Sequence, residues 1–129
     1  MSTLFSKIIA GEIPCEKIAE DDQFFAFMDI RPISPGHVLV IPKQETDRFF
    51  DLDESLLAAA MPFAKPIAIA IEKVVPCQRV GLMVAGIEVP HAHVHLVPIQ
   101  EMEAWSFAHA KPGDLDEIKA LAEKIRAAL

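Results

Sequence analysis

The chain has 129 residues, enough for one domain with a substantial core, and we expect a single domain over residues 1–129. A content of 52% hydrophobic and 24% charged residues is typical of an ordered globular protein and excludes a disordered one. The net charge of −7 argues against a nucleic-acid partner, because an acidic surface repels a phosphate backbone.

The sequence offers no signal for a membrane or an export pathway. No apolar run approaches the length of a bilayer-spanning segment, so we expect no membrane partner. The opening stretch MSTLFSKIIAGEIP is interrupted by charged residues and does not resemble a secretory signal, which favours a cytoplasmic location. Cys15 and Cys77 fit no metal-binding or redox spacing, and we expect both to be buried free thiols.

The first elements along the chain are predicted to be strands. The stretch EKIAEDDQFFAFMD, residues 16–29, reads as a hairpin whose second arm carries Phe25, Phe27 and Asp29 on one face. The prolines and glycine of IRPISPG make residues 30–36 a loop. HVLVIP, residues 37–42, then reads as a buried strand that ends at a proline.

Two helices are predicted, one central and one at the C-terminal end. The central helix spans residues 53–75, with Asp51 or Asp53 as its N-cap, and Pro62 and Pro66 should kink or break it. The second helix, in DLDEIKALAEKIRAAL, begins after Asp114. Its apolar residues recur at helical spacing and predict one buried face: Leu115, Ile118, Leu121, Ile125 and Leu129.

Two more strands are predicted between these helices. They are RVGLMVAG, residues 79–86, and HAHVHLVP, residues 91–98, and a tight turn around Gly86 joins them. Strands that come first, with helices inserted and appended, indicate an α+β domain built on an antiparallel sheet.

Three of the five histidines alternate with small or apolar residues in PHAHVHLVP. In a strand, His91, His93 and His95 would share one face, while the residues between them would face the core. Three uses compete for such a row. It can be a solvent-facing stripe, a metal site that takes a further ligand from elsewhere, or a site of nucleophilic and acid–base chemistry on phosphorus.

The histidine row resembles the His-x-His-x-His motif of the histidine triad (HIT) superfamily. The stretch FMDIRPISPGHVLVIPK resembles the nucleotide-binding branch of that superfamily and comes in the same order along the chain. The resemblance implies an α+β fold with an antiparallel sheet of about five strands, a central helix and a C-terminal helix. It also implies a homodimer whose two sheets join across the interface.

The resemblance implies a role for each matching residue. His93 would attack the α-phosphorus of a nucleotide and form a nucleotidyl-histidine, which water then cleaves. His91 and His95 would orient or polarise the phosphate, and His37 would be a fourth histidine of the site. Asp29 would hold the ribose hydroxyls, although a turn-capping role before Arg31 explains it as well. The residues implied for the base pocket would also pass as ordinary core: Phe5, Ile8, Phe27 and Ile30.

The chain departs from the family pattern near the phosphate. Many relatives have a Gly-Gln-Ser/Thr run before the triad, whereas this chain has GIEVP. Ile87 cannot donate a hydrogen bond from its side chain, and an ionised Glu88 would repel phosphate unless it serves as a general acid or base. Thr3 and Ser6 replace a cysteine pair with which some bacterial relatives hold structural zinc, so we expect no metal and no cofactor.

These features predict an enzyme that cleaves a phosphoanhydride or phosphoramidate bond at the α-phosphate of a nucleotide, with adenosine as the default nucleoside. The alternatives are a nucleotide-binding protein that has lost catalysis through its altered phosphate loop, and a metal-dependent protein. Outside the motif, His109 reads as a loop residue. Trp105 reads as core or as a cover for the pocket mouth or a dimer interface.

Overall fold

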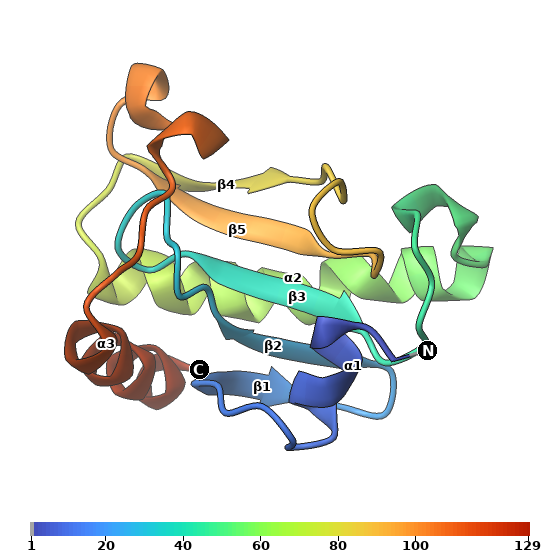
Figure 1. Ribbon diagram of the computed structural model, residues 1–129. Coiled ribbons are helices and arrows are strands. Elements are labelled where there is room, and N and C mark those ends of the chain that lie inside the picture. The colour runs from blue at the N-terminus through green and yellow to red at the C-terminus, as the bar shows by residue number, and fades with distance from the viewer. Residues whose placement is uncertain (1) are drawn as a thin grey trace.

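The structure, a computed structural model that describes residues 2–129, is built on a five-stranded antiparallel sheet with helices on both faces (Figure 1). The order across the sheet is β1-β2-β3-β5-β4. The strands are β1 (Lys17–Glu20), β2 (Phe24–Met28), β3 (Val38–Pro42), β4 (Arg79–Met83) and β5 (Val94–Ile99). The α-helices are α1 (Leu4–Ile9), α2 (Glu54–Val74) and α3 (Leu115–Ala128). This arrangement confirms the predicted α+β fold with a central and a C-terminal helix.

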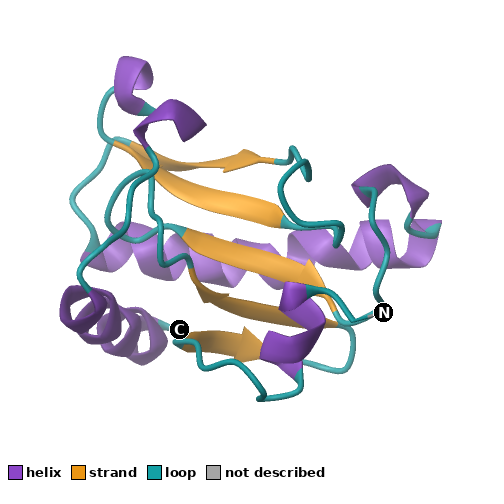
Figure 2. Ribbon diagram, in the orientation of Figure 1, coloured by secondary structure: helices purple, strands orange, loops and turns teal. Residues whose placement is uncertain are grey.

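The two faces of the sheet bury different residues, as the period of a strand requires. In β3, Val38 and Val40 contribute to the large core under α2 and α3, whereas Leu39 and Ile41 face the other way. That second face packs against Phe5 and other apolar residues of α1. Figure 2 shows α1 in front of the sheet and the long α2 behind it. Every residue of β2 and β3 is buried, so these strands lie within the protein and not at its edge.

The central helix α2 is continuous over 21 residues, which corrects the expectation that its prolines break it. Asp53 is the N-cap, and its carboxylate accepts the amide hydrogen of Leu56 at 3.0 Å. Both Pro62 and Pro66 are exposed, so their rings face solvent. The opposite side of α2 is buried in the large core at Leu56, Ala60, Ala64, Ile67, Ala70 and Ile71. We attribute the continuity to this packing, which outweighs the helix-breaking tendency of an internal proline, about 3 kcal/mol each.

The same helix corrects the expectation that no segment is long and apolar enough to span a bilayer. By length and composition α2 meets that criterion, with a mean hydropathy of 1.4 over 18 residues. Many of its apolar residues are alanines, which a search for unbroken bulky runs overlooks. In the structure α2 packs against the sheet and against α3, as the core helix of a folded domain does.

The buried face of α3 is narrower than predicted. Ile118 and Ile125 are buried as expected, together with Ala122, which was not predicted. Leu115 and Leu129 lie at the two ends of the helix and are 66% and 54% exposed, so their assignment to the core was wrong. The N-cap is Asp114 as predicted, and its carboxylate accepts two amide hydrogens of the first turn.

The two later strands are shorter than predicted. β4 ends at Met83 and β5 begins only at Val94, so a ten-residue loop, not a tight turn at Gly86, connects them. Ala92, Val94 and Leu96 do point into the core, as the alternation predicted. The cysteines are half-buried and not fully buried as expected, and both are free thiols.

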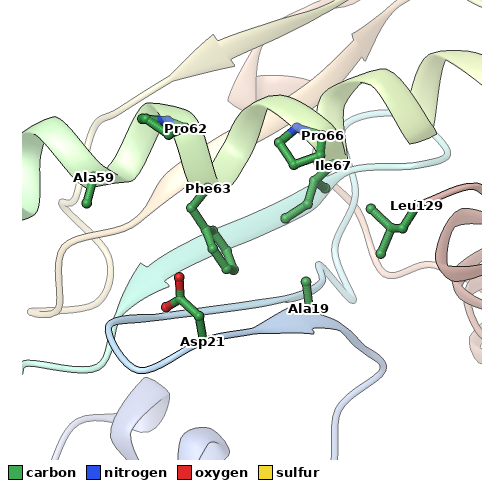
Figure 3. Close-up of a pocket in the computed structure, with 8 residues that line it drawn as sticks. All are labelled: Ala19, Asp21, Ala59, Pro62, Phe63, Pro66, Ile67 and Leu129. Carbon is green, nitrogen blue, oxygen red and sulfur yellow. The ribbon is translucent and has the colours of Figure 1, made fainter.

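A groove of about 440 Å³ lies between α2 and the β1–β2 hairpin (Figure 3). Phe63 points from α2 toward the hairpin, where Asp21 and Ala19 form the opposite wall. Phe63 also stacks on Phe24, a residue of the large core. The residues that line the groove include none of the predicted site residues, and α2 packs on the face of the sheet opposite α1.

Candidate active site

The histidines come together on the sheet face that carries α1. His95 lies on β5 directly opposite Leu39 of β3, and Leu39 belongs to the apolar cluster of that face. His93 precedes β5 by one residue, and its ring meets the ring of Phe5 edge-on at a centroid distance of 5.0 Å. His37 precedes β3, which pairs with β5, so its ring reaches that of His95. Two central strands therefore place three imidazoles side by side.

His93 is held in one tautomer by the backbone. Its Nδ1 lies 2.7 Å from the carbonyl oxygen of His91, and because a carbonyl only accepts, Nδ1 carries the hydrogen. In a neutral ring the lone pair is then on Nε2. The ring of His95 lies 4.9 Å from that of His93, centroid to centroid, at an interplanar angle of 67°. The ring of His93 is thus next to a second imidazole.

A chain of hydrogen bonds also fixes His37 and His95. The amide of Ile33 donates to Nδ1 of His37 at 3.0 Å, so the hydrogen of His37 is on Nε2. That Nε2 donates to Nδ1 of His95 at 2.9 Å, which leaves the hydrogen of a neutral His95 on its own Nε2. His95 therefore presents a donor from the same sheet face on which His93 presents a lone pair.

Burial keeps this pair neutral. Desolvation, and then the electrostatic interaction with the His93 ring, lower the pKa of His37 from 6.5 to about 4. Desolvation likewise lowers the pKa of His95 to about 3, with further contributions from His37 and His93, while Asp29 opposes the shift. Near neutral pH both side chains are uncharged and act as hydrogen-bonding groups.

The two histidines of the row with a free ring nitrogen also reach the surface. His93 and His95 are 5% and 7% exposed, against 0% for His91 and 1% for His37. Among residues 2–129, every buried side-chain nitrogen or oxygen atom has a hydrogen-bond partner. Nε2 of His93 and Nε2 of His95 make no hydrogen bond to a described residue, so solvent reaches both atoms. A ligand placed on this face can contact the lone pair and the donor together.

His91 departs from the role that the sequence suggested. Its Nε2 donates to the carbonyl of Pro42 at 2.8 Å, and its Nδ1 lies 2.7 Å from the hydroxyl oxygen of Thr3. Both ring nitrogens are thus used within the protein, and the side chain is fully buried. In this arrangement no nitrogen of the His91 ring is left for a phosphate, and the expectation that His91 orients or polarises one stays a prediction that these contacts do not support.

Most residues predicted for the base pocket lie together beside the histidines. Phe5, Ile8 and Phe27 belong to the small apolar cluster of this face, and Phe5 and Phe27 meet edge-on at 5.6 Å. Ile30 is 60% exposed and lies outside that cluster, in the loop after β2. A role for these side chains around a base stays a prediction.

Asp29 joins the end of β2 to the histidine pair. One carboxylate oxygen accepts the amide hydrogen of Arg31 at 2.8 Å, which is the turn-capping role left open by the sequence. The other lies 3.4 Å from Nε2 of His37. The side chain is 17% exposed and can accept further hydrogen bonds, so the ribose role stays a prediction alongside the capping role.

The loop before the histidine row adds little to the site. Glu88 is exposed and makes no side-chain hydrogen bond or ion pair with a described residue, and Ile87 is 89% exposed. The structure therefore provides no contact that supports Glu88 as a general acid or base. His109 is exposed in a short 3₁₀ turn, Phe107–His109, as expected of a loop residue. Trp105 packs against Gly81 of β4 and donates to the carbonyl of Val97 at 3.1 Å.

One set of side chains has the donor types of a metal site. Asp29, His37 and His95 each offer an atom, and these three atoms lie within 4.8 Å of one another. Nε2 of His37 and Nδ1 of His95 share a hydrogen at 2.9 Å, so in this structure these two nitrogens bond to each other. The absence of a metal stays a prediction.

The structure adds residues to the site that the sequence did not indicate. Thr3, Ser6 and Glu45 surround the ring of His91, and Phe107 meets the ring of His95 edge-on at 4.8 Å. The sequence signal for Thr3 and Ser6 is their place in the cysteine positions of relatives, which indicates the loss of a zinc site but not these hydrogen bonds. Glu45 and Phe107 are remote in sequence from the motif and had no signal.

The fold and the site together define an α+β protein of the histidine triad type, with a histidine whose free nitrogen faces solvent from an antiparallel sheet. The chain belongs to the HIT family: residues 10–102 match the family model described as the HIT domain. The family assignment made from the motif is thereby confirmed.

Known proteins similar to this chain include enzymes and solved structures. Adenosine 5'-monophosphoramidase hnt1 of Schizosaccharomyces pombe is 38% identical over 97% of this chain and 96% of its own length. Adenylylsulfatase HINT3 of Arabidopsis thaliana is 35% identical over 78% of this chain and 53% of its own length. The crystal structure of a Hit-like protein from Bartonella henselae superimposes with a TM-score of 0.86 at 33% identity, covering 99% of this chain and 97% of that one.

Proposed function

We propose that the protein is a nucleotide hydrolase or nucleotidyl transferase that cleaves a phosphoramidate or phosphoanhydride bond at the α-phosphate, through a covalent intermediate on His93. The observation that carries this proposal is the backbone-fixed tautomer of His93, which leaves Nε2 unprotonated and open to solvent. An adenosine phosphoramidate is the first substrate to test, since a relative 38% identical is named an adenosine 5'-monophosphoramidase.

In the first step the lone pair of His93 Nε2 attacks the α-phosphorus. A bond from phosphorus to Nε2 forms and the bond to the leaving group breaks, so His93 becomes a cationic phosphoimidazolium. The carbonyl oxygen of His91, 2.7 Å from Nδ1, stabilises this cation by accepting a hydrogen bond from its Nδ1–H. The nucleophile is therefore supported most strongly in the state in which it carries the nucleotide.

His95 is suited to donate a hydrogen bond to the leaving group. Its Nε2–H lies on the sheet face of His93, and the hydrogen bond from Nε2 of His37 to Nδ1 of His95 favours that tautomer. The pair has no ring nitrogen for a further proton, because Nδ1 of His37 accepts the amide hydrogen of Ile33. The proton that the departing amine or phosphate oxygen needs therefore comes with the substrate or from solvent, and His95 stays neutral throughout.

In the second step water attacks the phosphorus of the intermediate. A phosphorus–oxygen bond forms, the phosphorus–Nε2 bond breaks, and the proton of the water passes to solvent. The products are the nucleoside monophosphate and neutral His93. With another acceptor in place of water, the same chemistry transfers the nucleotidyl group.

The exposed loop with Ile87 and Glu88 favours a second candidate, a nucleotide-binding protein without turnover, because this loop offers phosphate no side-chain donor. Trapping separates the two. Incubation with an α-³²P-labelled adenosine phosphoramidate, followed by an alkaline quench, should leave label on the protein.

We expect His93→Ala to abolish both labelling and turnover while it still binds adenosine monophosphate. His109→Ala, a change of an exposed histidine, is the matched control and should label normally. Binding without labelling in the unaltered protein would support the second candidate. Turnover at the normal rate in His93→Ala would overturn the mechanism.

We further propose a homodimer in which β4 of one copy pairs with β4 of the other. β4 is an edge strand of the sheet, and Leu82 and Val84 are 42% and 38% exposed at that edge. Exposed apolar residues on an edge strand are typical of a surface that another strand covers. Sedimentation equilibrium, which measures the mass in solution, tests this proposal. The cytoplasmic location and the absence of a membrane partner stay predictions.

A further inference from the structure

The first histidine of the row stands outside the sheet. β5 begins at Val94, so no ladder hydrogen bond of the sheet holds residue 91. The carbonyl of His91 nevertheless has to point at Nδ1 of His93, because that contact decides which ring nitrogen is nucleophilic. The direction of this carbonyl therefore depends on how the rest of His91 is anchored.

The anchors are the two ring nitrogens and the adjacent backbone. The ring donates from Nε2 to the carbonyl of Pro42 and accepts at Nδ1 from the hydroxyl of Thr3, at 2.8 and 2.7 Å. The next amide, that of Ala92, donates to the carbonyl of Thr46 at 2.6 Å. Desolvation lowers the pKa of His91, which keeps the ring neutral and its Nδ1 an acceptor. The side-chain bond at Nδ1 is the one that comes from the N-terminal segment.

Thr3 is itself held by a carboxylate. Glu45 accepts the amide hydrogen of Thr3 and the hydroxyl hydrogen of Ser6, each at 2.7 Å. Ser6 is thus already committed to Glu45, and the hydroxyl hydrogen of Thr3 is free for His91, while its oxygen accepts the Ser6 amide at 3.0 Å. The Thr3 hydroxyl also lies 3.2 Å from Oγ of Ser6, and that Oγ lies 3.5 Å from Nδ1 of His91. Both contacts are longer than the 2.7 Å bonds from Thr3 to His91 and from Ser6 to Glu45, which we take as the hydrogen bonds of the cluster.

We infer that Thr3, Ser6 and Glu45 form a positioning network that acts through His91 to hold His93 in its nucleophilic tautomer. The inference rests on the proposed function of His93. It assigns to the N-terminal segment a role in the first chemical step. None of these three side chains needs to touch the nucleotide.

The first test removes one hydroxyl without changing side-chain shape. Thr3→Val deprives His91 of its donor. Thr46→Val makes the same change at the only other threonine: it keeps the backbone carbonyl that accepts the amide hydrogen of Ala92 and removes only a hydroxyl that, among the described residues, is bonded to the exposed Gln44. We expect Thr3→Val to slow labelling of His93 in a single turnover by about tenfold, within the hundredfold that a misplacement of about 1 Å causes. KM should change little, and Thr3→Ser should restore the rate.

The second test measures the tautomer without any substrate. Long-range ¹H–¹⁵N spectra should show the hydrogen of His93 on Nδ1 in the unaltered protein and in Thr46→Val, and a mixture of tautomers in Thr3→Val. Glu45→Ala, a change of an exposed residue, provides a second variant should Thr3→Val fold poorly. Glu45→Gln keeps an acceptor oxygen and should lie between Glu45→Ala and the unaltered protein.

The outcomes separate the inference from the proposed function. Equal labelling rates and equal tautomer ratios in Thr3→Val and Thr46→Val would overturn the network. If the unaltered protein forms no nucleotidyl-histidine with any substrate, the proposed function fails, yet a tautomer change in Thr3→Val would still support the positioning of His93.

Discussion

Acidification from pH 7 to pH 5 should destabilise the protein mainly through His37 and His95. Both are buried and uncharged, and folding lowers their pKa values from 6.5 to about 4 and about 3. Between pH 6.5 and about 4 the unfolded chain therefore binds more protons than the folded one. Stability is fully present above this window and falls as the pH is lowered through it.

The size of the effect follows from the pKa of an unfolded histidine. At pH 5 such a group lies about 1.5 units below its pKa of 6.5, which is about 2 kcal/mol per histidine at 1.36 kcal/mol per unit. The folded pair stays neutral at this pH, so the two histidines together remove about 4 kcal/mol. That is a large part of the free energy of unfolding of a typical domain, which is roughly 5–15 kcal/mol.

Urea unfolding at pH 7 and pH 5 measures this difference. His37→Gln removes one of the two titrating groups, and we expect its loss between the two pH values to be about 2 kcal/mol smaller than that of the unaltered protein. His109→Gln is the control, because that side chain is exposed, and should leave the loss unchanged. Hydrogen bonds lower the pKa of Glu20 and Glu45 below 4.5, so both stay ionised at pH 5. An equal loss in His37→Gln and the unaltered protein would refute the reasoning.

Two further changes test the packing around the site and the helix behind it. Gly81→Ala would place a Cβ 2.4 Å from Cζ2 of Trp105, so the indole must move. We expect the free energy of unfolding to fall by about 1–3 kcal/mol and the fluorescence emission of this single tryptophan to shift. Unchanged fluorescence would contradict the contact. Asp53→Ala removes the N-cap of α2 and should lower the urea midpoint by an amount equivalent to about 1 kcal/mol. Asp51→Ala, two residues earlier, should not, and equal effects would argue against the cap.

The fold was predictable where local pattern and tertiary packing agree. The hairpin around Asp21 and the caps at Asp53 and Asp114 follow from turn and capping chemistry that acts over a few residues. Continuity of α2 was not predictable, because Pro62 disfavours a helix locally and only the buried face of the whole element offsets it. The burial of Leu115 and Leu129 was also misjudged, since a helical repeat does not show that only the middle of α3 is buried.

The site was predictable from the spacing of the row but not from its hydrogen bonds. Alternation placed His93 and His95 opposite the core, which holds because Ala92 and Val94 do pack inward. The contacts of His91 were not predictable, since the row gives no indication that Thr3 and Pro42 occupy both ring nitrogens. Contacts of this kind join residues far apart in sequence, and a motif carries no information about them.

The strand order has a consequence for how long the site survives partial opening of the fold. His95 lies on β5 and His37 directly precedes β3. These two strands are neighbours in the sheet, with β4 on one side and β2 and β1 on the other. Fraying of a sheet starts from its margins, so the amides next to these two rings should be among the slowest to exchange with deuterium. The hydrogen bond between His37 and His95 then persists until the protein unfolds as a whole.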